Sequence, residues 1–367
     1  MISNYAWTIY NFRTPLIKKL LEDGYDISIL TQFDGYEKNL EELGCSAKHL
    51  FISRKGINPF VDIFTFFHIL TFLWLCKPFC CLTFTIKPVI YTSLAVKLLR
   101  CNNIAMITGL GTAFLKGGWL TYFIKKLYRN SLAGASYIFF QNIDDKNLFL
   151  EENLVSNDKC RLTPGSGIDL SKYKYSVCEP TQHFRFLLIA RLVWDKGIKE
   201  FVDASKLLHK DFPNTLFHII GPSGVQNRTA VSNSEIENWK KEGVVEYQGE
   251  VQDVRDYIKA ACCIVLPSYR EGTSRVLLEA AAIGRPIVTT NVPGCKELVL
   301  DGESGFLCEE KNPNDLYRKM EKMISLPLEQ RNNMGIVGRK HMENNFNHEL
   351  VCKIYQDALS ELNKKNS

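Results

Sequence analysis

Short apolar runs alternate with helical patterns of hydrophobic and polar residues in both halves of the chain. Each run has the length and composition of a strand. The predicted strands are residues 27–31, 80–85, 137–141, 184–190, 215–221, 244–249, 262–267 and 286–290. From Leu316 onward the pattern is mostly helical. This alternation predicts doubly wound α/β domains.

The 367 residues are enough for two domains of ordinary size, each with its own apolar core. Residues 173–181 are polar and include a proline, so we place the linker between the domains there. We expect a first domain over residues 1–175 and a second over residues 176–347.

The twelve cysteines include adjacent pairs at residues 80–81 and 262–263 and lie in apolar, strand-like runs. This placement predicts reduced, buried thiols rather than disulfides. The cysteines of residues 76–81 have no histidines at zinc-site spacing, which argues against a metal there. The start of the chain has no cleavable secretory signal, so we expect a cytoplasmic protein.

Positive charge is concentrated between residues 48 and 129, where eleven Lys or Arg stand against one acid, Asp62. Aromatic residues are interleaved with these cations. Such a region resembles an interfacial surface attracted to anionic lipid. Nucleic acid would attract the same charge, but the region contains no nucleic-acid-binding motif that we recognise. We therefore expect a membrane surface as the partner.

Residues 63–76 carry no formal charge but are too short to span a membrane as a helix. Two interpretations remain open: a helix buried against the first sheet, or a helix that faces the membrane. Residues 115–129 mix basic and apolar side chains at helical spacing and are the stronger candidate for a membrane-facing helix.

The most informative motif is residues 270–279, where Glu271 and Glu279 are eight residues apart at a transition from loop to helix. A predicted strand precedes it, Gly272 allows a turn, and Thr273 and Ser274 offer hydroxyls to the helix start. Donors at such a helix start suit a phosphate. Alternatively, the two carboxylates form ordinary salt bridges. The next strand follows at once, so the unit is βαβ, and its carboxyl edge predicts a ligand crevice.

Residues 271–279, together with residues 294–299 and 301–307, resemble the donor-site signature of retaining glycosyltransferase family 4. Residues 190–197 resemble the diphosphate loop of that family. Residues 85–88 and 140–145 are similar to its bacterial polysaccharide branch, which includes undecaprenyl-diphosphate-linked N-acetylgalactosaminyltransferases. The resemblance implies a GT-B fold, in which two Rossmann-like domains face each other across a cleft. It also implies that the C-terminal segment, residues 348–367, crosses back to the first domain.

A transferase of this kind must stabilise the negative charge that builds on the departing diphosphate. Arg191 and Lys196 follow a predicted strand and are candidates for this role, although both could be ordinary surface cations near Asp195. The resemblance implies that Glu271 contacts the donor sugar and that Glu279 accepts hydrogen bonds from the ribose. The remaining predicted donor-binding residues are Gly249, Gly272, Thr273 and Ser274. The resemblance further implies that the configuration at the anomeric carbon is retained by front-face attack, with no dedicated base, no metal and no cofactor.

Two features depart from the family pattern. The first strand, before residues 4–7, is nearly missing, so the true start of the chain could lie upstream of Met1. Residues 108–111, Thr-Gly-Leu-Gly, stand where many members carry a histidine. On the acceptor side, Gly109 and Gly111 either let a ligand approach the backbone or only shape a turn. Asn11 and Arg13 either contact the acceptor or diphosphate or only add polarity to a helix start.

We therefore expect a hexosyltransferase attached peripherally to the inner face of the cell membrane. It would move a hexose or N-acetylhexosamine, with N-acetylgalactosamine favoured, from a UDP-sugar to a polyprenyl-diphosphate-linked saccharide in O-antigen or capsule synthesis. Two alternatives remain open. One is a GT-B sugar-nucleotide epimerase or phosphorylase, and the other is a non-catalytic protein that binds the membrane surface.

Overall fold

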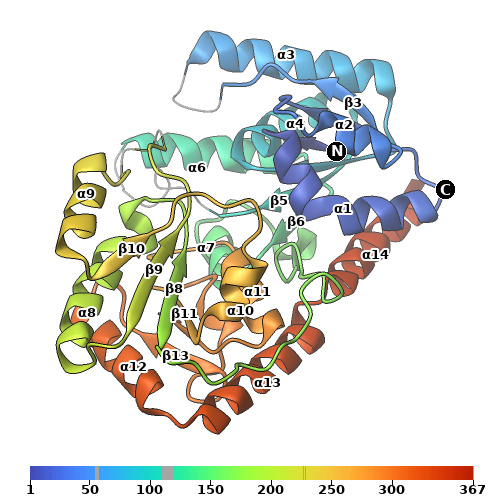
Figure 1. Ribbon diagram of the computed structural model, residues 1–367. Coiled ribbons are helices and arrows are strands. Elements are labelled where there is room, and N and C mark those ends of the chain that lie inside the picture. Colours follow the sequence, from blue (N-terminus) through green and yellow to red (C-terminus); the bar gives the residue numbers. More distant parts are fainter. Residues whose placement is uncertain (54–57, 110–118, 226, 228, 367) are drawn as a thin grey trace. The chain divides into compact units, whose positions relative to one another are not determined.

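The computed structural model describes residues 1–53, 58–109, 119–225, 227 and 229–366. The chain forms two compact units (Figure 1). The first unit comprises Met1–Gly167 and His348–Ser367, and the second comprises Ile168–Asn347.

The described part of the first unit contains a seven-stranded parallel sheet. Its order is β3 (Ser46–His49), β2 (Ser28–Thr31), β1 (Ile2–Ser3), β4 (Cys80–Phe84), β5 (Asn102–Ile107), β6 (Tyr137–Phe140) and β7 (Cys160–Leu162). The helices are α1 (Ala6–Glu22), α2 (Glu37–Glu42), α3 (Pro59–Cys76), α4 (Ile86–Leu99), α6 (Trp119–Leu132), α7 (Ile143–Glu151), the short η1 (Asn157–Lys159) and α14 (His348–Asn366). The nearly missing first strand is present as the two-residue β1, which pairs with β2 and β4.

The last helix, α14, belongs to the first unit although it is the end of the chain. Its buried stripe includes Val351, Tyr355 and Leu359, which lie in one apolar cluster with Ile9 of α1 and Phe139 of β6. These positions are four residues apart, so they share one face of the helix. The expected return of the C-terminal segment to the first domain is confirmed.

The described residues of the second unit form a six-stranded parallel sheet. Its order is β10 (Val245–Tyr247), β9 (Leu216–Ile220), β8 (Arg185–Ile189), β11 (Cys263–Leu266), β12 (Ile287–Thr290) and β13 (Gly305–Cys308). The α-helices are α8 (Ile198–Asp211), α9 (Asn233–Glu242), α10 (Arg255–Ala260), α11 (Arg275–Ile283), α12 (Pro313–Ser325) and α13 (Leu328–Asn345). The short 3-10 helices are η2 (Trp194–Lys196) and η3 (Lys296–Leu298).

Both faces of the second sheet are covered. Phe186 and Leu188 of β8 pack in a cluster with residues of α8, α9 and α12. Leu187 and Ile189, the alternate residues of the same strand, pack with residues of α10, α11 and α13. A strand that buries both faces is expected in a parallel sheet between two helical layers. The predicted fold class, two doubly wound Rossmann-like domains, is confirmed, and the loops after these strands meet at one edge of the sheet.

The boundary between the units differs from the predicted one. We assigned residues 168–175 to the first domain, but they pack within the second unit, which begins at Ile168. The reason is burial: Ile168 and Tyr173 belong to the apolar cluster around α11. Because most of the segment is polar, the sequence pattern does not indicate that Ile168 and Tyr173 are buried.

Candidate active site

Three loops at the carboxyl edge of the second sheet pack against one another. The loop after β8 contacts the loop after β11, because the Tyr269 amide donates to the Asp195 carbonyl over 2.9 Å. The loop after β11 contacts the loop after β12 in turn, where the Glu271 amide donates to the Pro293 carbonyl over 3.0 Å. Residues far apart in sequence are thereby brought to one place.

Two glycines make these close approaches possible. Gly197 has a φ of +71°, and a Cβ there would lie 2.0 Å from the Pro267 carbonyl oxygen. Gly294 has a φ of +80°, and a Cβ there would lie 2.4 Å from the Glu271 carbonyl oxygen. Any other residue would force the loops apart, since side-chain carbons do not approach oxygen so closely. We assigned no role to either glycine from the sequence, although each lies in a quoted motif.

The predicted catalytic residues Lys196 and Glu271 form an ion pair between the Lys196 Nζ and the Glu271 Oε1. Their side chains are 19% and 14% exposed, so both charges lie in a partly desolvated site that still opens to solvent. Lys196 is the last residue of η2, and Glu271 lies in the loop after β11. The pair places a cation beside a carboxylate at the edge where a ligand crevice was predicted.

Glu279 lies on α11, is 7% exposed, and is held by two donors. The Tyr173 hydroxyl donates to its Oε1 over 2.7 Å, and the Arg275 Nε donates to the same oxygen over 2.9 Å. The Arg275 partner could have been predicted, because a spacing of four residues places two side chains side by side on a helix. Tyr173 could not, since it is 106 residues away.

The helix start differs in detail from the prediction. Helix α11 begins at Arg275, so Glu279 lies on the helix and Glu271 lies in the loop before it. Gly272 lies in a bend before α11, as predicted, and Gly294 of the neighbouring loop has a positive φ. Ser274 is buried, and its amide already donates to the Gly294 carbonyl over 2.9 Å. Its side chain makes no capping bond. Ser274 thus anchors the loops to each other.

Arg191 and Gly249 lie at the same edge. Arg191 is exposed directly after β8, and Gly249, with a φ of +80°, follows β10. The Gly221 amide donates to the Gly249 carbonyl over 2.8 Å. A Cβ on Gly221 would lie 1.9 Å from the Ala190 carbonyl oxygen. Gly221 therefore lies against both segments, the one that carries Arg191 and the one that carries Gly249.

The predicted acceptor-side residues belong to the first unit. Asn11 and Arg13 lie inside α1, where the Asn11 amide donates to the Trp7 carbonyl over 3.0 Å. Arg13 is 4% exposed, and its guanidinium carbon lies 4.4 Å from the centre of the Phe84 ring. Gly109 follows β5 with a φ of +136°, and Gly111 lies outside the described residues. Burial gives Arg13 a packing role in this unit.

A separate cavity of about 320 Å³ lies in the second unit. Its lining residues come from β8, β9, α10 and the residue after β10: Arg185, Leu187, His218, Gln248, Asp256, Tyr257 and Ala260. It includes none of the predicted site residues. We base the candidate site on the loop contacts, because the predicted chemistry lies there.

Comparison with known proteins identifies relatives of this chain. Residues 173–341 match the family model Glycosyl transferases group 1. The chain is 28% identical over 340 residues to N,N'-diacetylbacillosaminyl-diphospho-undecaprenol alpha-1,3-N-acetylgalactosaminyltransferase of Campylobacter jejuni subsp. jejuni serotype O:2, covering 88% of each protein. It is 25% identical over 348 residues to the capsular polysaccharide biosynthesis glycosyltransferase CapM of Staphylococcus aureus, covering 91% of this chain and 90% of CapM.

A solved structure, that of HepE from Anabaena in complex with UDP and glucose, matches 98% of both chains with a TM-score of 0.75 and 16% identity. At that identity the likeness shows the fold, which is GT-B. The matched domain and the relatives identify the protein as a glycosyltransferase. Residues 173–341, most of the second unit, form a glycosyl transferases group 1 domain, and the enzyme is a hexosyltransferase.

Proposed function

We propose that this enzyme transfers a hexose or N-acetylhexosamine, with N-acetylgalactosamine favoured, from a UDP-sugar to a polyprenyl-diphosphate-linked saccharide. The product would serve in O-antigen or capsule synthesis. The observation that carries the proposal is the Lys196–Glu271 pair among three packed loops at the carboxyl edge of the second sheet. The Campylobacter and Staphylococcus relatives support the class of acceptor and the pathway through their names.

In the proposed reaction the bond between the anomeric carbon and the β-phosphate oxygen of the donor breaks. A bond from the same carbon to the acceptor hydroxyl oxygen forms on the same face, and the hydroxyl proton passes to the departing phosphate oxygen. The products are UDP and the extended saccharide. Negative charge grows on the diphosphate during this step, so Lys196 and Arg191 would lower its barrier.

The two carboxylates would have different tasks. Glu271 would orient Lys196 through their ion pair and would contact the donor sugar. Glu279 would accept hydrogen bonds from the ribose, since a carboxylate has several acceptor positions. Gly249, Gly272, Thr273 and Ser274 would line the rest of the donor site. With two cations facing the diphosphate, the proposed reaction needs no metal, and its rate should be unchanged by a chelator.

The proposed partner of the first unit is an anionic membrane surface. Helix α3 buries Thr65, Ile69 and Leu73 and exposes an apolar face on the opposite side. We call this exposed set the α3 face: Phe60, Ile63, Phe64, Phe67, Trp74 and Leu75. By length and composition alone α3 could cross a membrane, with 17% of the segment buried. Because its other stripe packs in the core of the unit, we propose that it lies in the interface instead.

Charge supports this proposal. Asp62, the single acid between residues 48 and 129, pairs with Lys87 at 2.7 Å and is thereby neutralised. Exposed cations of the same unit include Lys48, Lys77, Lys97, Arg100 and Lys126. They would attract anionic headgroups. Attachment at the inner face of the cell membrane would bring the enzyme to its lipid-linked acceptor.

A direct assay tests the function. The purified full chain is incubated with individual UDP-sugars and short polyprenyl-diphosphate-linked saccharides, and products are followed by mass spectrometry. We expect one donor to add a single sugar to the acceptor. Incubation of that donor without acceptor should leave it unchanged, whereas an epimerase would convert it. Absence of transfer with every donor, in the presence of anionic vesicles, would overturn the proposal.

A further inference from the structure

Glu279 is held in a way that fixes which of its oxygens can serve a ligand. The Tyr173 hydroxyl and the Arg275 Nε both donate to Oε1, from two separate segments of the chain. The Arg275 guanidinium carbon also lies 5.5 Å from the centre of the Tyr173 ring. With Oε1 engaged twice, the carboxylate presents Oε2 as its acceptor for a ligand.

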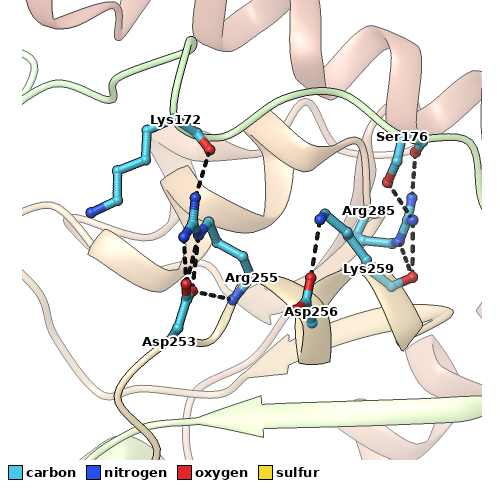
Figure 2. Close-up of polar contacts among 7 residues, drawn as sticks. All are labelled: Lys172, Ser176, Asp253, Arg255, Asp256, Lys259 and Arg285. Carbon is cyan, nitrogen blue, oxygen red and sulfur yellow. Dashed lines mark hydrogen bonds and ion pairs between the residues drawn. The ribbon is translucent and has the colours of Figure 1, made fainter.

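The position of Tyr173 is itself secured by arginines that bind the backbone around it. The Arg339 Nη1 donates to the Tyr173 carbonyl over 2.7 Å and to the Ala282 carbonyl of α11 over 2.8 Å. On either side, Arg255 donates to the Lys172 carbonyl and Arg285 to the Ser176 carbonyl (Figure 2). The segment is thus held by Arg255 of α10, by Arg339 of α13 and by Arg285, which follows α11.

The hydroxyl of Tyr173 stays a donor. Burial, followed by the charge of Glu279, raises the pKa of Tyr173 far above neutrality. The residue is 6% exposed, so water does not compete strongly for its hydrogen bond. A buried hydrogen bond to a charged group contributes about 1.5–3 kcal/mol, roughly a tenfold to hundredfold factor in an equilibrium.

We propose that Tyr173 and Arg275 are positioning residues that hold Glu279 Oε2 in place to accept the ribose hydroxyls of the nucleotide. The inference rests on the proposed function, because it assumes a nucleotide donor at Glu279. Neither residue needs to touch the reacting atoms. Loss of the Tyr173 hydroxyl should therefore weaken recognition of the ribose and leave the turnover of saturated enzyme nearly unchanged.

The test compares UDP with 2′,3′-dideoxy-UDP, which lacks both ribose hydroxyls, by titration calorimetry on the full chain. Wild type should bind UDP at least tenfold more tightly than the dideoxy compound. Tyr173→Phe should reduce this preference by about tenfold by weakening UDP alone. In turnover assays its donor KM should rise while kcat stays within twofold. A general loss of structure would weaken both compounds equally.

Tyr317→Phe is the matched control, because the Tyr317 hydroxyl also donates to a carboxylate, Asp211 Oδ2, over 2.9 Å but lies on α12. It should keep the full preference for UDP. If Tyr173→Phe melts at a lower temperature than this control, Arg275→Gln repeats the comparison on the second donor.

The outcomes separate the two proposals. If wild type prefers UDP and both Tyr173→Phe and Arg275→Gln keep the whole preference, the positioning role alone is overturned. A wild type that binds no uridine nucleotide overturns the proposed donor and the inference with it.

Discussion

The Lys196 Nζ binds the Glu271 Oε1 although the two residues are 75 positions apart, on loops that follow different strands. Each charge is mostly buried, so each depends on the other for compensation. Removal of one partner leaves an uncompensated charge beside the place where the diphosphate would bind. The pair is therefore both a part of the structure and the centre of the proposed chemistry.

We predict that Lys196→Ala, Glu271→Ala and Arg191→Ala each reduce kcat/KM at least a hundredfold, about 2.7 kcal/mol of transition-state stabilisation. The fold should survive, as far-UV circular dichroism would show. Lys199→Ala is the control, because Lys199 pairs with Asp203 nearby but is 67% exposed. Single variants that keep near-full turnover with the true substrates would contradict the site.

A double-mutant cycle on the same pair sharpens this prediction. Lys196→Ala with Glu271→Ala should lose less than the sum of the single losses, because groups that act as a unit are not additive. The measurement is kcat/KM for all four proteins under the same conditions. Additive losses would mean that the two side chains act independently and that their contact has no catalytic consequence.

The strands could be predicted well from the sequence, and the contacts between loops could not. All eight predicted strands are present, from β2 to β12. The strands that were not predicted include β1 and β7, with two and three residues, which carry too little pattern. The strand β5 begins with Asn102 and Asn103, whose polarity masks it.

The candidate site likewise contains residues that the sequence indicates and contacts that only the structure shows. The two acidic residues and the cations could be found because they stand in motifs. Their partners depend on how loops distant in sequence pack, as the Tyr173 bond to Glu279 illustrates. The requirement for glycine at positions 197 and 294 likewise follows only from the structure, which shows how close the neighbouring carbonyl oxygen lies. Hydrophobic periodicity predicts individual helices and strands, whereas these contacts are made between loops that belong to several elements.

We predict that Arg285→Met strongly destabilises the second unit. Arg285 is 2% exposed and donates to the carbonyls of Ser176 and Lys259 over 2.7 and 3.0 Å (Figure 2). Methionine leaves these buried acceptors without their donor, at a cost of about 3–5 kcal/mol. Urea unfolding followed by circular dichroism measures the change.

Arg255→Met is the control for this variant, since Arg255 is also shown in Figure 2 but its side chain is 37% exposed in its pair with Asp253. We expect a loss of about 1 kcal/mol or less, as for other surface pairs. Equal losses in the two variants would show that buried Arg285 holds the segment that contains Tyr173 no more strongly than exposed Arg255, which donates to the Lys172 carbonyl over 3.4 Å.

We predict that His218 makes the second unit less stable in mild acid. Burial lowers the pKa of His218. Glu246, whose Oε2 lies 3.2 Å from the His218 Nε2, opposes this lowering, and Arg185 adds to it. The unfolded chain then binds a proton more readily than the folded one. Stability is fully present above pH ~6.5 and falls as the pH drops toward the folded pKa, by up to ~1.4 kcal/mol per pH unit.

His218→Gln should flatten this dependence, whereas His183→Gln, at an exposed histidine, should leave it unchanged. Urea midpoints between pH ~5.5 and ~7.5 give the comparison, a window set by the unperturbed histidine pKa. A wild type whose midpoint is constant over this range, or rises on acidification, would show that Glu246 outweighs burial and Arg185.

The last prediction concerns the α3 face. Phe60, Phe64 and Phe67 are 85%, 57% and 57% exposed, and burial of each phenylalanine is worth about 1.5–3 kcal/mol. We expect the triple variant to serine to lose at least tenfold in affinity for vesicles that contain phosphatidylglycerol. Lys126→Glu should weaken binding to these vesicles and not to neutral ones, and high salt should act likewise.

The control places serine at Leu300 and Ile336, exposed apolar positions of the second unit. Because the triple variant leaves the loops around Lys196 unchanged, its turnover with a short, water-soluble acceptor should equal that of wild type. Sedimentation of the variant with vesicles at wild-type affinity would exclude α3 as the attachment site.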